Sequence, residues 1–350
     1  MTKRYNKGEW SEFYAFLEIL STGKLYAADE NMNKIATVYY TILSAVKNDI
    51  EYNRIDTGGI ITFEHEGKVT NISIEDFKNM SHQLFQVIKS SNATFSVPEI
   101  EPFIEKLHLT TIKERSDSKG DIKLKIHDNF TGFEPTLSFS IKSYVGSNPT
   151  LLNASRGTIL RYKLTGNLSD SEINDINNIE GKGKVIKRIE EIRSKGLNLI
   201  YKDIPATIFK ENLQMIDYRL PEIISEIFLE SYFVRGKRIS EVVQSYLEKN
   251  PHENDRIIKY KVREFLVAIA LGMVPLTEWS GLDEANGGYI VVKDTAEVLC
   301  YHVYERNRLK EYLYTHTKFD TPSTGRTNAG QLLTDANGEI VFNLTMQIRF

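Results

Sequence analysis

The chain is poor in the residues that build covalent cross-links and metal centres. It has a single cysteine among 350 residues, Cys300, so no internal disulfide can form. Its seven histidines are scattered, and no C-x-x-C or H-E-x-x-H motif occurs, so we expect no zinc site. We interpret Cys300, in the strand-like stretch VLCYHVY, as a small core residue of a protein that resides in a reducing cytoplasm.

Long apolar runs and a dominant charge are also missing. No segment is apolar enough to span a bilayer, and the first residues, MTKRYNKGEWSEFY, lack the apolar core of a signal peptide. The chain has 44 Lys and Arg against 47 Asp and Glu, a net charge of −3. A protein that coats nucleic acid indiscriminately would be strongly basic, because its affinity comes from counterion release. The balance of charge still permits a DNA partner that is recognised through a local basic surface.

Helical and strand patterns are both present. Apolar residues at helical spacing predict helices over residues 8–20 and 74–90, with a strand pair at 58–74 between them. A second strand pair is predicted at 121–127 and 137–143, and residues 185–273 are predicted to be mostly helical. The C-terminal part predicts a strand pair, a helix near 305–316 and a closing strand.

A polar stretch near the middle of the chain suggests a subdomain boundary. Residues 164–183 are rich in Asn, Asp and Gly, a composition typical of connecting segments. We therefore divide the chain into residues 1–165 and 166–350, with a single domain as the alternative.

The stretch TLSFSIKS, residues 136–143, carries one long lysine among small serines. Leu137, Phe139 and Ile141 fall on one face of the predicted strand, and Ser138, Ser140 and Lys142 fall on the other. Asp121 stands at the start of the preceding strand. Because antiparallel strands run back on each other, Asp121 and Lys142 can converge at one end of the sheet.

Such a pair can carry hydrolytic chemistry. A carboxylate and a strand carbonyl can bind Mg²⁺, and an ammonium group can orient a water molecule and counter phosphate charge. Hydrolysis of a phosphodiester requires these parts. The alternative is a solvated lysine at a strand end, and pairs of an acid and a lysine on one hairpin also arise by chance.

The residues around this hairpin resemble a known family. The stretch KGDIKLKIHDNFTGFEPTLSFSIKSYVGSNPTLLNAS is similar to the core of the HpaII family of type II restriction endonucleases. The resemblance begins at NKGEWSEFYAFLEILSTGKLYAAD, passes through FLVAIALGMVPLTEWSG and GGYIVVK, and ends at DTPSTGR and NLTMQIRF. It implies a PD-(D/E)xK nuclease that uses Mg²⁺. The implied fold is α/β (α+β), a restriction-endonuclease-like core with a mixed β-sheet flanked by helices, and the second half is mostly helical.

The resemblance also implies which residues form the site. The motif aspartate is Asp121, the motif lysine is Lys142, and the carbonyl of Ile141 is the expected backbone ligand. Two departures from the family pattern matter. Gly120 replaces the proline before the aspartate, and Ser140 replaces the acid two positions before the lysine.

The missing acid must then come from elsewhere. Some enzymes that cut CCGG-centred sites share an S-x-K motif and recruit a distant glutamate. Glu9 and Glu12 share one face of the first predicted helix, and we favour Glu12 as the metal ligand with Glu9 close behind. The alternative is that both acids only stabilise the positive end of the helix dipole. Glu134, in the turn of the hairpin, is a rival.

Candidate DNA-reading residues are polar and lie in loops. Ser143 and the following loop offer side chains for backbone or bases, and the DTPSTGR stretch offers a further serine and an arginine suited to guanine or phosphate. The set is Ser143, Asn148, Thr150, Asn153, Ser323 and Arg326. Ordinary loop polarity is the alternative for each.

The combined prediction is a Mg²⁺-dependent type II restriction endonuclease that cuts double-stranded DNA at a short, CCGG-like sequence. Residues 1–165 would form the nuclease core, and residues 166–350 would bind DNA and complete the core. A palindromic target favours a homodimer. A DNA methyltransferase is expected in the same system, though not as a bound subunit. The alternatives are a repair or structure-specific nuclease of the same superfamily, and a DNA-binding protein without catalysis.

Overall fold

The computed structural model describes residues 3–113, 120–129, 131–321 and 329–350. Two compact units share these residues. The first unit comprises Met1–Pro149, Ala270–Gly272 and Asp283–Tyr312, and the second comprises Thr150–Ile269, Met273–Leu282 and Leu313–Phe350. The chain therefore passes from one unit to the other several times, and a single boundary near residue 165 does not describe this division. The serine and arginine expected to read DNA in DTPSTGR, Ser323 and Arg326, lie outside the described residues.

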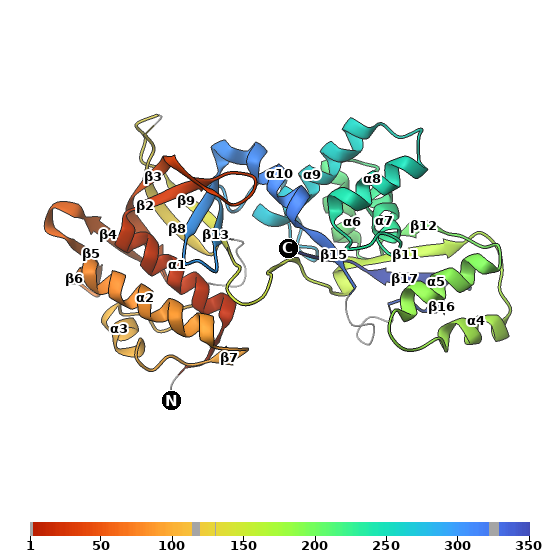
Figure 1. Ribbon diagram of the computed structural model, residues 1–350, viewed down its shortest axis with the longest axis horizontal. Helices are drawn as coiled ribbons and strands as arrows, with labels where there is room; N and C mark the ends of the chain where they lie inside the picture. The colour runs from red at the N-terminus through yellow and green to blue at the C-terminus, as the bar shows by residue number, and fades with distance from the viewer. Residues whose placement is uncertain (1–2, 114–119, 130, 322–328) are drawn as a thin grey trace. The chain divides into compact units, whose positions relative to one another are not determined.

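A nine-stranded mixed sheet forms the centre of the first unit (Figure 1). The pairs β9–β13 and β2–β14 are parallel, and the other neighbours are antiparallel. An additional pairing of β2 with β3 closes the first six strands of the sheet into a ring. In their order across the sheet the strands are β2 (Lys24–Ala28), β14 (Val298–His302), β13 (Gly288–Val292), β9 (Thr136–Ser143), β8 (Ile122–His127), β3 (Lys34–Lys47), β4 (Ile50–Ile55), β5 (Ile60–His65) and β6 (Lys68–Ser73).

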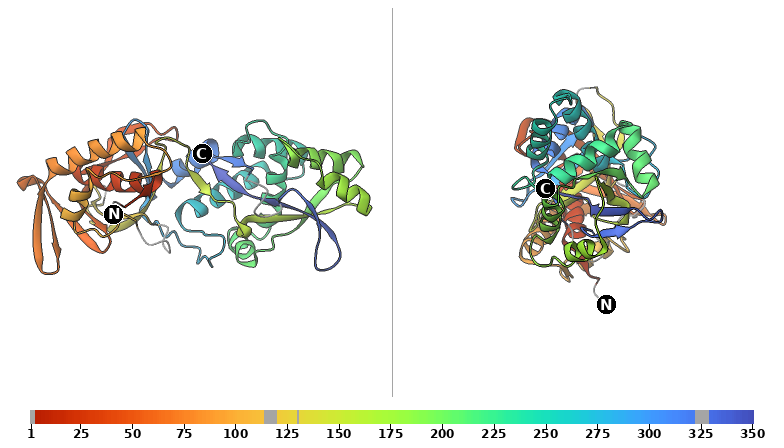
Figure 2. Two further views of the ribbon diagram at one scale, coloured as in Figure 1. Left: turned by 90° about the horizontal axis from the view of Figure 1, so that it is seen from below. Right: turned by 90° about the vertical axis from the view of Figure 1, so that its right-hand side faces the viewer.

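Helix α1 (Lys7–Thr22) covers this sheet and packs against α2 (Ile74–Ser90), as Figures 1 and 2 show. Asn6 caps α1, and the helix ends at Gly23, whose φ of 68° is left-handed. The buried face of α1 is mostly apolar and includes Trp10, Phe13 and Phe16. The first unit also contains α3 (Glu101–Lys106) and a two-stranded pairing of β1 (Tyr5–Asn6) with β7 (Thr94–Phe95). The buried apolar face of α1, which includes Trp10, Phe13 and Phe16, thus holds this helix on the nine-stranded sheet.

Two smaller sheets and a group of helices form the second unit. One sheet is ordered β10-β18-β15, and the other is ordered β12-β11-β17-β16. The strands are β10 (Thr150–Leu152), β11 (Ile159–Leu164), β12 (Leu199–Asp203), β15 (Lys318–Asp320), β16 (Leu332–Thr334), β17 (Ile340–Thr345) and β18 (Gln347–Arg349). The helices are α4 (Asp170–Asn177), α5 (Lys184–Ser194), α6 (Thr207–Ile216), α7 (Leu220–Glu230), α8 (Ile239–Lys249) and α9 (Asp255–Leu271). Helix α10 (Arg306–His316) contains the change of unit after residue 312, and 3₁₀ turns lie at Asp56–Gly58, Arg156–Thr158 and Val303–Glu305.

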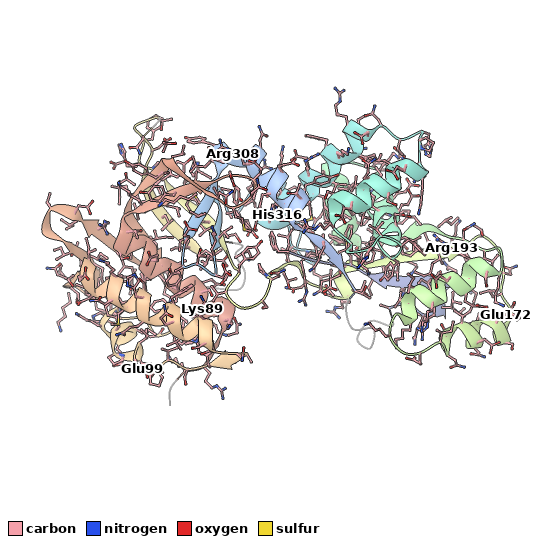
Figure 3. The ribbon with its side chains drawn as sticks, viewed as in Figure 1. Lys89, Glu99, Glu172, Arg193, Arg308 and His316 are labelled. Atoms are coloured by element: carbon pink, nitrogen blue, oxygen red, sulfur yellow. The ribbon has the colours of Figure 1, made fainter. Side chains whose placement is uncertain are left out.

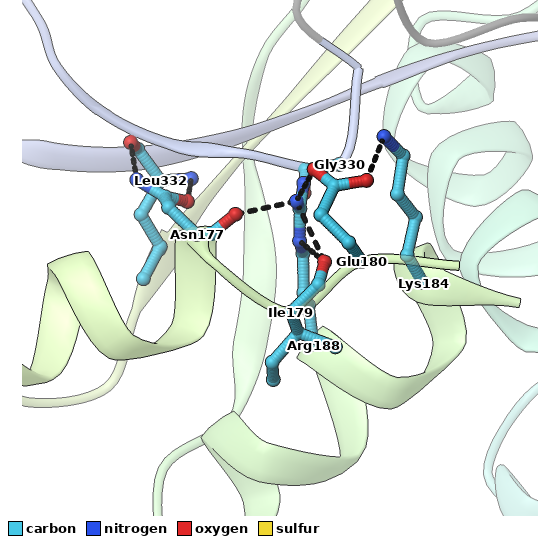
Figure 4. A network of polar contacts seen from close by, with 7 residues as sticks. All are labelled: Asn177, Ile179, Glu180, Lys184, Arg188, Gly330 and Leu332. Atoms are coloured by element: carbon cyan, nitrogen blue, oxygen red, sulfur yellow. Dashed lines mark hydrogen bonds and ion pairs between the residues drawn. The ribbon is translucent and has the colours of Figure 1, made fainter.

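Arg188 of α5 is fully buried and joins three segments of the second unit (Figure 4). Its guanidinium donates to the carbonyls of Asn177, Ile179 and Gly330, at 2.5 to 3.1 Å. Glu180 adds an ion pair at 3.3 Å. The polar stretch around residue 180 is therefore held inside the second unit and does not separate two domains. Nearby, Glu172 of α4 and the exposed Arg193 of α5 lie on the surface of this unit (Figure 3).

The predicted elements and fold class are confirmed. The first helix, the 58–74 hairpin, the helix from 74 to 90 and the hairpin of β8 and β9 all form within two residues of the expected bounds. Cys300 is a buried residue of β14, as expected. The sequence did not predict β3, whose 14 residues pair with β2, β4 and β8. No helix among the described residues is long and apolar enough to cross a membrane.

Candidate active site

Asp121 lies directly before β8 and is tied to the end of β9. Its backbone N–H donates to the carbonyl of Phe139 at 2.8 Å, and its Oδ2 accepts a hydrogen bond from the N–H of Ile141 at 2.6 Å. The hydroxyl of Ser140 donates to the same oxygen at 3.3 Å. The other oxygen, Oδ1, forms no hydrogen bond with a described residue. Strand pairing thus holds this carboxylate in one orientation.

Lys142 lies at the same end of the hairpin, two residues beyond Ser140. Its ammonium donates to the carbonyl of Ile141 at 3.1 Å, and the side chain is only partly exposed. The strand pairing therefore brings together Asp121, the Ile141 carbonyl and Lys142, as the antiparallel arrangement predicted. Ser140 is 1% exposed, so the polar face of this strand is covered at that position.

Glu12 projects from α1 toward these groups. Burial and the nearby charge of Asp121 raise the pKa of Glu12 to about 7, although Lys142 and Lys47 act in the opposite direction. Its carboxylate forms no hydrogen bond with a described residue, which is unusual for a largely desolvated acid. A site in which one carboxylate opposes the ionisation of its neighbour favours a bound cation.

Glu9, the second acid on this face of α1, has structural partners. Its Oε2 accepts a hydrogen bond from the N–H of Asn6 at 2.7 Å, and its N–H donates to the side chain of Asn6. Its Oε1 forms an ion pair with Lys113 at 2.7 Å. Both oxygens are therefore engaged in a capping box and an ion pair, and Glu12 is the better candidate for a metal ligand.

The rival acid Glu134 lies at the other end of the hairpin. It forms an ion pair with Lys125 at 3.8 Å, and its Oε1 lies 3.5 Å from Nδ1 of His127. Lys125 pairs with the first residue of β9, whereas Asp121 precedes β8, so the length of the strand pair separates the two acids. Glu134 does not join the group around Asp121.

Lys47 is a residue of this site that the sequence did not reveal. It is the last residue of β3 and is 2% exposed, and its charge acts on Glu12. A fully buried lysine is rare without a partner of opposite charge. In the sequence, Lys47 looks like an ordinary polar end of a strand before the turn Asn48-Asp49, and only the packing of α1 over β3 brings it to Glu12.

The residues expected to bind DNA are divided between the two units. Ser143 ends β9, and its hydroxyl accepts a hydrogen bond from the N–H of Val145 at 3.2 Å. Asn148 is exposed in the loop that follows. Thr150 begins β10 and pairs with Arg349, and Asn153 is exposed after that strand; both belong to the second unit.

The donor set fits a hard divalent cation. Two carboxylates, Glu12 and Asp121, and the carbonyl of Ile141 offer oxygen atoms, which are the ligands that Mg²⁺ prefers. Within the described parts of the chain, no group of three His, Cys, Asp or Glu side chains could hold a metal by itself. A set of three protein ligands around Glu12 and Asp121 would therefore need a backbone oxygen, such as the carbonyl of Ile141.

The two cavities found in the described part of the first unit lie away from the candidate site. A cavity of about 250 Å³ in the first unit is lined by Glu18, Lys24 and Tyr26 among others, and by none of Glu12, Asp121 and Lys142. Small-molecule enzymes bury most of their ligand in a cavity. Two acids, a backbone carbonyl and a lysine at the end of a sheet suit the hydrolysis of a phosphodiester, and the class of protein that they define is a nuclease.

The comparisons with known proteins agree with this class. The model of the HpaII restriction endonuclease family matches residues 6–350. The type II restriction enzyme HpaII of Haemophilus parainfluenzae is 39% identical over 358 residues, which cover 99% of this chain and 98% of that protein. No solved structure matches the chain. The chain belongs to the HpaII restriction endonuclease family, and it is a site-specific DNA endonuclease.

Proposed function

We propose that this enzyme is a Mg²⁺-dependent homodimer that cuts double-stranded DNA at a short, CCGG-like sequence. The observation that carries the metal assignment is the convergence of Glu12 on Asp121 and Lys142, from an element far away in the sequence. Because burial and the charge of Asp121 raise the pKa of Glu12, a bound cation would stabilise its ionised form. Type II restriction enzymes generally use divalent metal ions, which supports this choice.

Glu12, Asp121 and the Ile141 carbonyl would hold the Mg²⁺ ion. The metal, when bound, would supply positive charge to the phosphate as a bond to phosphorus is exchanged. Ser140 donates a hydrogen bond to Asp121 and would keep that carboxylate aimed at the cation. We assign to Lys142 the orientation of the attacking water, because its ammonium lies beside the proposed carbonyl ligand. Lys47 would offset the charge of Glu12 from the interior side.

The two units would have different roles in cleavage. We assign catalysis to the first unit, which holds the acids and Lys142, and DNA binding chiefly to the second. The first unit has 21 basic and 26 acidic residues, whereas the second has 23 basic and 21 acidic residues. The less acidic unit is the better partner for a polyanion. Thr150 and Asn153 of the second unit, with Ser143 and Asn148 of the first, remain our candidates for DNA contacts.

The palindromic nature of a CCGG-like target supports the dimer, because two-fold DNA symmetry is matched by two-fold protein symmetry. The relative HpaII supports the target only as a resemblance, since a few side chains can change specificity. A cytoplasmic location and a separate DNA methyltransferase that protects host DNA follow from the same proposal.

A plasmid digestion tests the proposal. The protein is incubated with plasmid in Mg²⁺, and a parallel reaction contains EDTA. Discrete fragments that require Mg²⁺ and share CCGG-like ends would agree with the proposal. A smear would indicate a non-specific nuclease, and intact DNA that shifts in a gel would indicate a binding protein. Either result would overturn it.

A further inference from the structure

Lys7, the first residue of α1, lies on the bare backbone of Gly146. Gly146 is in the exposed loop after β9 and has a φ of 96°, a conformation that side chains rarely adopt. A Cβ atom added at Gly146 would lie 3.2 Å from Cδ and 3.3 Å from Cε of Lys7, and it would collide with the ammonium nitrogen. The lysine therefore occupies the space that a side chain at position 146 would need.

This contact lies between the two elements that carry Glu12 and Lys142. Lys7 precedes Glu12 by five residues on the same helix, which is about 7.5 Å along the helix axis. Gly146 follows Lys142 by four residues. Lys7 thus joins the beginning of the helix that carries Glu12 to the loop that leaves the strand of Lys142.

The charge of Lys7 is not neutralised by the protein that the structure describes. Lys113, at the same end of α1, forms an ion pair with Glu9. Lys7 forms no ion pair with a described carboxylate, although acids outnumber bases in the first unit. A lysine that contacts the loop after the Lys142 strand, and that has no carboxylate partner among the described residues, is suited to an anion that arrives with the substrate.

We propose that Lys7 binds a backbone phosphate of the DNA next to the phosphate that is cleaved, and that Gly146 leaves the space for it. The inference deepens the proposed function and depends on it. A phosphate contact fixes the position of the duplex without reading its sequence. Lys7 is therefore a binding residue, and its loss should act on affinity more than on the chemical step.

Binding of a short duplex that carries the sequence cut by the wild-type enzyme tests this inference. Affinity is measured by fluorescence anisotropy in Ca²⁺ over a range of salt concentrations. We expect Lys7→Ala to bind about five- to tenfold more weakly and to lower the salt slope by about one, the mark of one lost phosphate contact. Lys7→Arg should restore most of the affinity. Single-turnover cleavage in Mg²⁺ at saturating protein should stay within about threefold of wild type.

Lys68 provides the matched control. It is an exposed lysine without an ion pair to a described residue, at the tip of the β5–β6 hairpin in the same unit. In the sheet, β6 is five strands from β9, roughly 24 Å away at the usual strand spacing. Lys68→Ala removes the same charge and should leave the affinity and salt slope unchanged.

Gly146→Ala tests the contact itself. The added methyl group should displace Lys7 and weaken binding although every charge is kept. Strain in the loop would also weaken binding, so the double variant is needed. If Gly146→Ala acts through Lys7, it should have little further effect in the Lys7→Ala background.

Equal affinity and salt slope for Lys7→Ala and wild type would overturn the inference. Equal losses in Lys7→Ala and Lys68→Ala would do the same, because they would indicate a general charge effect. Fully additive losses in the double variant would refute the role of Gly146. In each case the wild-type enzyme would still cut plasmid, so the proposed function would stand; a wild type that neither cuts nor binds the duplex would reject the proposed function instead.

Discussion

Two charged side chains, the fully buried Arg188 of the second unit and the partly buried Glu12 of the first, differ in their hydrogen bonds. Arg188 of the second unit is fully buried, and each of its three nitrogens donates to a carbonyl. Glu12 of the first unit has no hydrogen bond with a described residue, and its pKa is raised to about 7 by burial and by Asp121. A charge with all its partners stabilises a fold, whereas a charge that lacks them is set up for a ligand.

The largest effect should follow from removing the acid that is fixed most firmly in the site. We expect Asp121→Ala to lower cleavage by roughly a thousandfold or more, because several kcal/mol of charge stabilisation are lost. Specific DNA binding and the melting temperature should be kept. Single-turnover cleavage and anisotropy measure the two properties. Retention of more than about a tenth of the cleavage rate would reject Asp121 as a metal ligand.

Arg188 should show the opposite pattern. Arg188→Met removes the hydrogen bonds to Asn177, Ile179 and Gly330 and leaves buried carbonyls without donors, so unfolding should be easier by about 3–5 kcal/mol. Urea unfolding measures this loss. The fraction that remains folded should cleave DNA at the wild-type rate. If Arg188→Met had normal stability but failed to cleave DNA, Arg188 would have a functional role, and the contrast with Glu12 would be wrong.

Measurements in two different metals distinguish the two possible roles of Lys142, orientation of the attacking water and binding of a phosphate. If it orients the attacking water, Lys142→Ala should leave DNA affinity in Ca²⁺ within a few-fold while cleavage in Mg²⁺ falls by about a hundredfold or more. Ca²⁺ is a suitable probe because it accepts oxygen ligands in a looser geometry. Weakened binding with normal turnover at saturating protein would instead show a phosphate clamp.

The raised pKa of Glu12 predicts how metal-free protein responds to pH. A carboxyl group whose pKa is higher in the folded state keeps its proton there more strongly than in the unfolded state. The folded state is therefore disfavoured as pH rises from about 4.5 to about 7, by at most about 1.4 kcal/mol per pH unit. Urea unfolding in EDTA should show this slope in wild type and not in Glu12→Gln. Equal slopes in the two proteins would mean that folding does not raise the pKa of Glu12.

The smallest effect should come from the neighbouring acid. Glu9→Gln removes the ion pair with Lys113 but can keep a hydrogen bond to Asn6, so we expect a loss of under about 1 kcal/mol in stability. Cleavage should stay within a few-fold of wild type, whereas Glu12→Gln should be nearly inactive. Inactivation by Glu9→Gln alone, with Glu12→Gln active, would reverse our choice between the two acids.

Local signals were enough to predict much of the fold and the convergence of Asp121 with Lys142. The helix that carries Glu12 has a capping box and an apolar face, and the hairpin that joins Asp121 to Lys142 follows from the geometry of antiparallel strands. These features depend on residues that are close in sequence. The sequence could only favour Glu12 over Glu9, because both acids lie on the same face of α1. The structure separates them by showing that Glu9 is engaged with Asn6 and Lys113.

The remainder depends on contacts between distant segments. Lys47 reaches Glu12 only because α1 packs over β3, and Arg188 reaches Gly330 across 142 positions of the chain. The polar, glycine-rich composition around residue 180 suggested a boundary. Composition alone does not reveal that the buried Arg188 binds the carbonyls of Asn177 and Ile179 in this stretch. The return of residues 283–312 to the first unit is likewise a property of the parallel pairing of β13 with β9.

Iron-directed cleavage of the protein backbone tests most directly the central claim, that Glu12, Asp121 and the Ile141 carbonyl bind the metal. Fe²⁺ replaces Mg²⁺, and ascorbate with peroxide generates radicals that cut the backbone near the metal. If Glu12, Asp121 and the Ile141 carbonyl hold the cation, cuts should map close to these three residues, weaken as Mg²⁺ is added, and disappear in Asp121→Ala. Cuts that cluster elsewhere, or that persist in Asp121→Ala, would contradict the account.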